Sequence, residues 1–347
     1  MNKVIISTDI RTLLTQQIGE IEHDKRFLLC DETTRQLCLP VMADLPCLQD
    51  TTLITIGATD THKTLDTLSH VWTELSQHGG TRHSLLINLG GGMVTDLGGF
   101  AASTFKRGIQ YINIPTTLLS MVDASVGGKT GINFGGLKNE IGVFSQPHCV
   151  LIDTTFLRTL DHQNILSGYA EMLKHGLIST TEHWAELLNF DLAHIDYQHL
   201  ANMVGTSVAV KERIVTEDPL EHGIRKALNL GHTAGHAFES WTLTRHPVLH
   251  GYAVAWGLIC ELYLSCTKTH FPTDRMRQTV RFVREHYGSL PITCDDYPEL
   301  YQLMTHDKKN TAGSINFTLL ADIGDIRINQ TATQDEIYEM LDFFREG

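Results

Sequence analysis

The first half of the chain alternates short apolar runs with amphipathic segments. The runs are Val4–Ile6, Phe27–Cys30, Leu53–Ile56, Leu85–Leu89, Tyr111–Ile114 and Cys149–Ile152. Several are separated by stretches with helical periodicity, such as residues 61–78. Apolar strands that alternate with helices are typical of a mainly parallel, Rossmann-like sheet with helices on both faces. We therefore predict an α/β domain over residues 1–160.

From about Leu160 the pattern becomes helical, which predicts a mostly α-helical domain over residues 161–347. A helix is expected over Leu166–Ile178. The longest apolar run, Ala253–Leu264, is interrupted by Glu261 and is too short to span a bilayer, so it predicts a buried helix. A short hairpin around Ile315–Ile328 is the expected exception.

Composition narrows the class of protein. The 347 residues are 42% hydrophobic and 19% charged, as in ordinary globular proteins. The net charge of −13 argues against a nucleic acid or an anionic membrane as partner. None of the seven cysteines forms a Cys-x-x-Cys pair and no signal peptide is evident, which favours reduced thiols in the cytoplasm.

Three histidines in the second half are candidates for chemistry. His232 and His236 are four residues apart and would share one helix face. His250 follows a loop with Pro247, and its neighbour Gly251 would allow a close backbone approach. Three nearby imidazoles indicate a metal site, a proton relay, or both. Chance spacing is the competing interpretation, because the chain has 19 histidines.

A carboxylate on the expected helix 166–178 bears on this choice. Glu171, Lys174 and His175 fall at i, i+3 and i+4, and Glu171 has apolar neighbours in sequence. A buried carboxylate needs a cation or a metal, whereas a surface Glu–Lys pair is the alternative. One glutamate and two histidines would leave an open position on the ion, as in catalytic zinc sites.

Glycines follow one of the predicted strands. Gly90–Gly92 comes directly after Leu89, where backbone N–H groups at a helix start would cradle a phosphate, although a tight turn explains the glycines equally well. The segment is not a dinucleotide fingerprint, because Thr95 stands at its third glycine. Asp60 and Lys63, after Ile56, are alternative contacts for ribose and phosphate.

A second glycine cluster, Val126–Gly131, imitates a P-loop but has Asp123 in place of the first glycine, which argues against a nucleoside triphosphatase. It would instead present Lys129 to a ligand. Further cationic residues could gather with it in one cleft, although separate solvated basic faces would also explain them. A shared cleft would suit a small substrate with two anionic groups. These residues are Arg107, Lys138, Lys211, Arg225, Lys308 and Lys309.

Long motifs resemble the 3-dehydroquinate synthase family, within the sugar-phosphate cyclases. They are Gly90–Asp96, Phe100–Gly108, Pro115–Asp123, Val126–Thr130, Leu137–Asn139, Ala170–Lys174 and Asn229–His236, in the family's order. The resemblance implies conversion of 3-deoxy-D-arabino-heptulosonate 7-phosphate to 3-dehydroquinate and phosphate in the shikimate pathway. It also implies an N-terminal NAD-binding domain, a metal-binding helical domain, a divalent metal, usually Zn²⁺ with Co²⁺ as alternative, and a homodimer.

The family's roles carry over to matching positions. The metal ligands would be Glu171, His232 and His250. The catalytic residues would be Asp123, Lys129, Asn139, Lys174 and His236. The substrate would be held by Lys138, Lys211, Arg225, Asn229, one or both of Lys308 and Lys309, and Arg107, the last from the neighbouring subunit. NAD contacts would fall on Asp60, Lys63, Gly92, Met93, Val94, Thr95, Asp96, Thr116, Thr117, Lys129, Lys138, Phe156, Leu157, Arg158 and Thr159.

Two positions depart from the family pattern. Tyr252 stands where a glutamate is usual, and Thr95 replaces a common glycine. Neither removes an expected ligand, so they bear on residues around the metal and on NAD contacts. The competing hypotheses are another sugar-phosphate cyclase, such as one making 2-deoxy-scyllo-inosose, a metal-dependent alcohol dehydrogenase of similar architecture, and a catalytically inactive relative.

Overall fold

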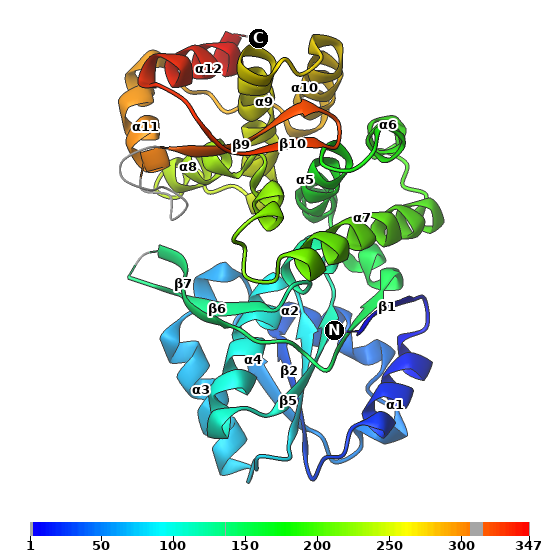
Figure 1. The fold of residues 1–347 in the computed structure, drawn as a ribbon. Helices are drawn as coiled ribbons and strands as arrows, with labels where there is room; N and C mark the ends of the chain where they lie inside the picture. Colours follow the sequence, from blue (N-terminus) through cyan, green and yellow to red (C-terminus); the bar gives the residue numbers. More distant parts are fainter. Residues whose placement is uncertain (1–2, 136, 306–314, 347) are drawn as a thin grey trace. The chain divides into compact units, whose positions relative to one another are not determined.

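The computed structural model describes residues 3–135, 137–305 and 315–346. It divides into two compact units (Figure 1). Unit 1 comprises Met1–Asp161 and Tyr197–Ala201, and unit 2 comprises His162–Asp196 and Asn202–Gly347. Residues Tyr197–Ala201, the first turn of a helix that continues into unit 2, therefore group with unit 1. A single domain boundary near residue 160 does not include this return of the chain. Among the described residues, no helix has the length and apolar character needed to cross a membrane.

Unit 1 is built on a six-stranded sheet in the order β1-β8-β5-β4-β2-β3. Every neighbouring pair of strands runs parallel. Each of the six predicted runs lies in one of these strands, so the parallel Rossmann-like sheet is confirmed. The strands are Lys3–Ser7 (β1), Arg26–Asp31 (β2), Thr52–Ile56 (β3), Leu85–Gly90 (β4), Gln110–Pro115 (β5) and Cys149–Asp153 (β8).

Helices cover both faces of this sheet. Apolar side chains of α3 and α4 join strand residues such as Leu29 and Ile54 in one buried cluster. Helix α1 lies on the opposite side of the sheet in Figure 1. The helices of unit 1 are Ile10–Glu20 (α1), Glu32–Leu37 (α2), Leu65–Gln77 (α3) and Gly92–Thr104 (α4), with shorter turns at Leu39–Val41, Pro46–Leu48, Asp60–His62, Phe105–Arg107, Ser120–Ala124 and Thr154–Thr159.

An antiparallel hairpin packs against α4. It consists of β6 (Lys129–Phe134) and β7 (Leu137–Phe144). A Cβ atom built on Gly99 of α4 would lie 2.6 Å from Cγ2 of Thr130, so only glycine permits this approach. Lys129 lies on β6, and Lys138 and Asn139 lie on β7 of this hairpin.

Unit 2 is mostly helical, as predicted. The expected hairpin near its end is confirmed, with β9 (Asn316–Asp322) antiparallel to β10 (Asp325–Thr331). The helices are His162–Leu177 (α5), Thr181–Asn189 (α6), Tyr197–Glu217 (α7), His232–Thr242 (α8), His250–Thr269 (α9), Thr273–Tyr287 (α10), Tyr297–Thr305 (α11) and Gln334–Glu346 (α12), with short turns at Ile224–Asn229 and Cys294–Asp296.

Glycines let α5, α8 and α9 meet backbone to backbone. A Cβ atom on Gly251 of α9 would overlap the carbonyl of Ser167 in α5. One on Gly257 of α9 would overlap the carbonyl of Gly231, directly before α8. The central part of α9 is buried, as the apolar run predicted. These contacts hold together the three helices that carry the candidate site.

Candidate active site

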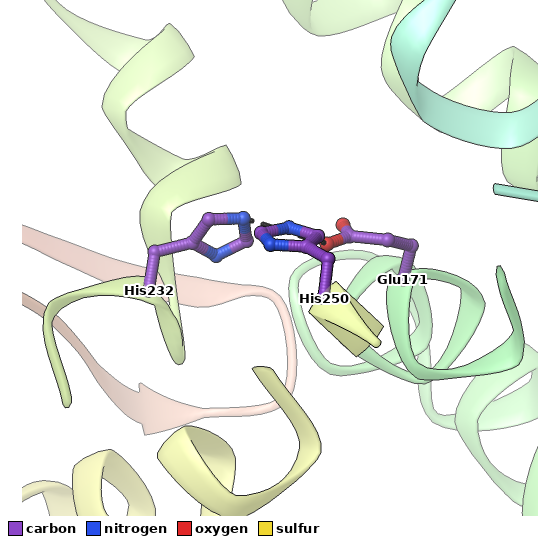
Figure 2. A group of neighbouring side chains, drawn as sticks. All are labelled: Glu171, His232 and His250. Atoms are coloured by element: carbon purple, nitrogen blue, oxygen red, sulfur yellow. Dashed lines mark ion pairs between the residues drawn. The ribbon is translucent and has the colours of Figure 1, made fainter. Parts of the chain in front are cut away.

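Glu171, His232 and His250 converge inside unit 2, each from a different helix (Figure 2). Oε1 of Glu171 lies 3.4 Å from Nε2 of His232 and 3.6 Å from Nε2 of His250. One ligand atom from each residue lies within 4.8 Å of the others. The three side chains named from sequence therefore share one small volume.

The spacing fits a divalent cation. Ligands at zinc-type bond lengths on a tetrahedron lie roughly 3.3 Å apart, close to the two glutamate–histidine distances. Oε1 of Glu171 is fully buried, and these distances are too long for good hydrogen bonds, so this acceptor lacks one. A shared cation would satisfy it. Three protein ligands leave a fourth position for substrate or water, as in catalytic sites.

The two imidazoles are oriented by hydrogen bonds from their other nitrogens. Nδ1 of His232 lies 3.1 Å from the carbonyl oxygen of Leu230, to which it donates, so Nε2 carries the lone pair that could bind a cation. Nδ1 of His250 lies 3.3 Å from Oε2 of Glu239. Such partners fix the ring of a metal-binding histidine and raise its basicity.

Charge in the site is dominated by carboxylates. Burial disfavours the charged form of Glu171, but Lys174 and His232 hold its pKa well below the ordinary range. Burial lowers the pKa of His232 to about 4, with Glu171 opposing. Burial acts in the same direction on His250, yet Glu239 and Glu171 raise its pKa to about 10. Ionised glutamates that face these imidazoles make a cation favourable here.

Lys174 and His236 flank the triad. Nζ of Lys174, a fully buried group on α5, donates to Oε2 of Glu171, the oxygen turned away from the histidines. The His236 ring centroid lies 5.3 Å from that of His232 and 5.9 Å from that of His250. The expected catalytic groups of unit 2 thus lie beside the expected ligands.

The expected substrate residues of unit 2 lie on α7 and before α8. Lys211 is buried in α7. Arg225 and Asn229 belong to the short turn that leads into α8, where the Arg225 backbone N–H donates to Oδ2 of Asp218 at 3.0 Å. Asn229 donates to Oε1 of Glu221 at 2.9 Å. Lys308 and Lys309 lie outside the described residues.

The expected NAD residues of unit 1 follow four of its strands. Because all the strands run parallel, their carboxyl ends share one edge of the sheet, where α/β folds bind ligands. Gly91 and Gly92, after β4, begin α4 and face the loop after β5: a Cβ on Gly91 would lie 3.1 Å from Thr117. The Thr116 backbone N–H donates to the Gly90 carbonyl at 3.0 Å. The chain reverses its direction across the sheet between β2 and β4, so this loop lies at a topological switch point.

Residues 156–159 follow β8 at the same edge. Sγ of Cys38 lies 3.9 Å from Oγ1 of Thr159. Burial raises the pKa of Cys38 to about 11, while the contact with Thr159 opposes the shift. Cys38 therefore contacts the segment after β8. The same segment holds Arg158, whose guanidinium stacks 4.5 Å from the ring of Tyr197.

A buried lysine, Lys63, links the first turns of α4 to the β6–β7 hairpin. Nζ of Lys63 donates to Oδ2 of Asp96 at 2.5 Å and also to Oδ1 of Asn139. Asn133 accepts from the Asn139 backbone N–H at 3.0 Å and donates to Oδ2 of Asp60 at 3.0 Å. These bonds bring together residues expected at NAD and at substrate. Met93, Val94 and Thr95 share the first turns of α4 with Asp96.

Asp123, Lys129 and Lys138 lie in the segment after β5. Asp123 belongs to the turn Ser120–Ala124, and Gly127 and Gly128 then adopt positive φ values of 109° and 69°. Lys129 follows directly and is exposed. The glycine-lined turn that presents this lysine is as predicted. Nζ of Lys138 lies 3.7 Å from Oδ2 of Asp60.

Arg107 is not brought to this edge. It lies just past the C-terminal end of α4, whereas Gly92–Asp96 forms the other end of this helix, about 18 Å away. Gln110 then begins β5, so Arg107 lies at the amino edge of the sheet. The resemblance assigns Arg107 to a neighbouring subunit, and that assignment stays a prediction.

Two glutamates of the site were not identified from sequence. Glu239 binds His250, and Glu261 binds the backbone at the start of α8. Glu239 lies three residues after His236 on the same helix, so the periodicity that paired the histidines could have included it. Glu261 was visible as the charge that interrupts the apolar run of α9.

The two departures have structural explanations. Tyr252 packs edge-on against Tyr287, with ring centroids 5.2 Å apart, and against Trp256. The hydroxyl of Thr95 donates to the Gly92 carbonyl at 3.2 Å, so α4 itself satisfies it. Tyr252 therefore belongs to an aromatic cluster, and Thr95 is accommodated in the first turn of α4.

Comparison with known proteins gives a consistent result over the whole chain. Residues 53–167 match the family described as 3-dehydroquinate synthase N-terminal, and residues 168–310 match 3-dehydroquinate synthase C-terminal. The chain is 55% identical over 346 residues to 3-dehydroquinate synthase of Parabacteroides distasonis, which covers 99% of this chain and 98% of the relative.

Solved structures agree in fold. The 2-epi-5-epi-valiolone synthase of Streptomyces hygroscopicus subsp. jinggangensis, with NAD⁺ and Zn²⁺ bound, superposes with a TM-score of 0.87 at 25% identity, over 100% of this chain and 97% of that one. A 2-deoxy-scyllo-inosose synthase complexed with carbaglucose-6-phosphate, NAD⁺ and Co²⁺ has a TM-score of 0.86 at 21% identity, over 99% and 96%.

The identity to the Parabacteroides enzyme extends over both units, whereas the solved cyclases share the fold at much lower identity. The two family matches meet at residues 167 and 168, within α5. The resemblance found in the sequence motifs is thus confirmed, and the chain belongs to the 3-dehydroquinate synthase family.

Proposed function

We propose that Glu171, His232 and His250 hold a divalent cation with which this chain carries out the 3-dehydroquinate synthase reaction. The observation that carries the proposal is the buried Glu171 oxygen between two oriented imidazoles, at tetrahedral-edge distances from both. The relatives solved with NAD⁺ and Zn²⁺ or Co²⁺ support a cation of this kind. Zinc is the expected metal, since the ligands are one carboxylate and two imidazoles.

NAD is proposed to bind at the carboxyl edge of the unit 1 sheet. The turn at Gly91 and Gly92 leads into α4, whose first N–H groups and dipole favour a phosphate. Asp60 and the loops after β5 and β8 line the same edge. The cofactor supplies reversible hydride transfer, and the cation polarises a substrate hydroxyl.

The residues of this chain position the substrate and its protons. Lys174 keeps one oxygen of Glu171 occupied, so the other faces the histidines. His236 lies beside the ligands, within reach of a substrate group bound there. Within unit 2, Arg225, Lys211 and Asn229 are proposed to hold anionic substrate groups. With NAD bound, reversible oxidation of a substrate hydroxyl would acidify the neighbouring C–H and so allow phosphate to leave by β-elimination.

The direct test is phosphate release. Purified protein with NAD and Zn²⁺ is expected to release one phosphate per 3-deoxy-D-arabino-heptulosonate 7-phosphate consumed. Treatment with a chelator should abolish the release, and added Zn²⁺ or Co²⁺ should restore it. Measuring phosphate and absorbance at 340 nm together separates the alternatives. No release with NAD and metal present, or a steady accumulation of NADH, would contradict the proposal.

Glu239→Gln tests the orientation of His250. The variant keeps the shape of the side chain but loses the charge that binds Nδ1 of His250. We expect metal affinity to fall by roughly tenfold, with the fold intact. Competition against a chelator of known affinity measures this. Glu299→Gln is the matched control, since Glu299 is an exposed carboxylate on α11 that pairs with Arg245. Equal affinities in both variants would show that Glu239 does not support the site.

The homodimer, the cytoplasmic location and the choice of zinc over cobalt stay predictions.

A further inference from the structure

Glu261 is a fully buried carboxylate in the middle of α9. Its oxygens accept hydrogen bonds from three backbone N–H groups at the start of α8. The N–H of Gly231 lies 2.6 Å from Oε2, and those of Thr233 and Ala234 lie 2.9 Å and 3.3 Å from Oε1. A carboxylate buried in an apolar helix is costly, so these bonds are its compensation.

The start of α8 depends on this carboxylate. Its N-cap residue is Gly231, which has φ of 80° and no side chain with which to cap the helix. The first N–H groups of a helix have no partner within it and carry a partial positive charge. Glu261 therefore supplies, from another helix, the cap that α8 lacks.

The first residue of the capped helix is the proposed ligand His232. Its ring is oriented by the carbonyl of Leu230, directly before the cap. The bonded N–H groups flank His232 on both sides in sequence, so Glu261 fixes the backbone from which this ligand projects. Glu261 is one turn beyond Gly257, whose contact with Gly231 brings α9 close enough for these bonds.

A second carboxylate, Glu239, makes the reciprocal contact from α8 to α9. Glu239, on α8, binds the ring of His250, on α9. Each of the two helices thus carries one ligand and provides a glutamate that fixes the ligand of the other. This exchange links the positions of His232 and His250 more tightly than packing alone would.

We propose that Glu261 is a positioning residue for the metal site, acting through the turn Gly231–Ala234 to hold His232 in place for the cation. The inference rests on the proposed function in one respect, namely that His232 is a metal ligand. It adds a residue that touches neither metal nor substrate.

The test is Co²⁺ binding to apoprotein carrying Glu261→Gln. The amide retains the size of the side chain but loses its charge and one acceptor, and its NH₂ group would face backbone donors. We expect Co²⁺ affinity to fall roughly ten- to hundredfold and the visible Co²⁺ spectrum to change. The rise in Tm caused by saturating Co²⁺ should shrink as well, because that increment reports affinity and not the stability of the apoprotein.

Thr180→Ala is the matched control. Thr180 caps α6, where its hydroxyl accepts from the His183 backbone N–H at 3.2 Å. This variant should lower the apoprotein Tm and leave both Co²⁺ affinity and the Co²⁺-induced Tm increment unchanged. If Glu261→Gln likewise lowers the apoprotein Tm without changing Co²⁺ affinity or the Co²⁺-induced Tm increment, Glu261 is only a structural cap and the inference is overturned.

Glu261→Asp covers the case in which the glutamine variant does not fold. It keeps the charge on a side chain shorter by one methylene, and we expect a smaller loss of Co²⁺ affinity in a folded protein. If the glutamine variant does not fold and Glu261→Asp binds Co²⁺ as tightly as wild type, the inference is overturned.

If wild-type apoprotein binds no Co²⁺, the proposed function fails together with the inference. If wild type binds Co²⁺ and the folded glutamine variant binds equally well, only the inference fails.

Discussion

Replacing His232 by alanine is expected to remove metal binding and to reduce phosphate release by roughly a thousandfold or more. The variant deletes one of three protein ligands and leaves the buried oxygen of Glu171 without the imidazole 3.4 Å away. A Lewis-acid cation stabilises charge in the transition state by several kcal/mol, and about 4 kcal/mol corresponds to a thousandfold in rate. The measurements are Co²⁺ titration of the apoprotein and phosphate release at saturating substrate.

His183→Ala provides the matched control. His183 is also a buried histidine of unit 2, but its Nε2 lies 3.0 Å from the hydroxyl of Ser207 on α7. Its removal should lower Tm, whereas the folded protein should bind Co²⁺ with unchanged affinity. A His232→Ala variant that binds Co²⁺ like wild type, or releases phosphate within threefold of its rate, would refute the proposed ligand set.

Of the variants proposed here, Gly251→Ala is expected to destabilise the folded protein most. The added methyl group would overlap the backbone carbonyl of Ser167, which cannot rotate away as a side chain could. The Gly251 backbone N–H also donates to Oγ of Ser167 at 3.1 Å. Helices α5 and α9 must separate to make room, at a cost of about 3 kcal/mol or more. Because Glu171 lies on α5 and His250 on α9, metal affinity should fall as well.

Chemical denaturation with and without Co²⁺ measures both effects. The control is Gly19→Ala, near the end of α1, where an added Cβ meets nothing within 4 Å. That substitution should stabilise the protein by about 0.5–1 kcal/mol, since alanine loses less conformational entropy than glycine in a helix. If Gly251→Ala changed the free energy of unfolding by the same amount as Gly19→Ala, the close approach of α5 and α9 would be refuted.

The sequence predicted the sheet well for a physical reason. Strands buried on both faces are continuous apolar runs, as in β2, β4, β5 and β8. The partly exposed edge strands β1 and β3 also carry apolar runs, so all six were recognised. The hairpin that carries Asn139 was not predicted as such. Its second strand, Leu137–Phe144, is exposed along its whole length, so no contrast of buried and exposed positions marks it.

The candidate site was predictable where residues share an element. His232 and His236 were paired by helical spacing, and Glu171 was recognised by its apolar neighbours. A shared site for Glu171 and two histidines was one of two interpretations of the residues, and the family resemblance specified His232 and His250. The convergence of α5, α8 and α9 itself depends on tertiary contacts at Gly251 and Gly257. Glu261 could be recognised as out of place in an apolar run, but its partners are backbone groups that no sequence pattern identifies.

Two of the proposed ligands lie on the consecutive helices α8 and α9, but Glu171 lies on α5, which is separated from them by α6 and α7, so no single segment can assemble the site. The cation therefore has its full set of partners only after α5, α8 and α9 have docked. Bonds that form this late are largely absent from the transition state for folding, so the bound ion should act mainly on the rate of unfolding. Metal would then extend the lifetime of the native protein while leaving its speed of refolding nearly unchanged.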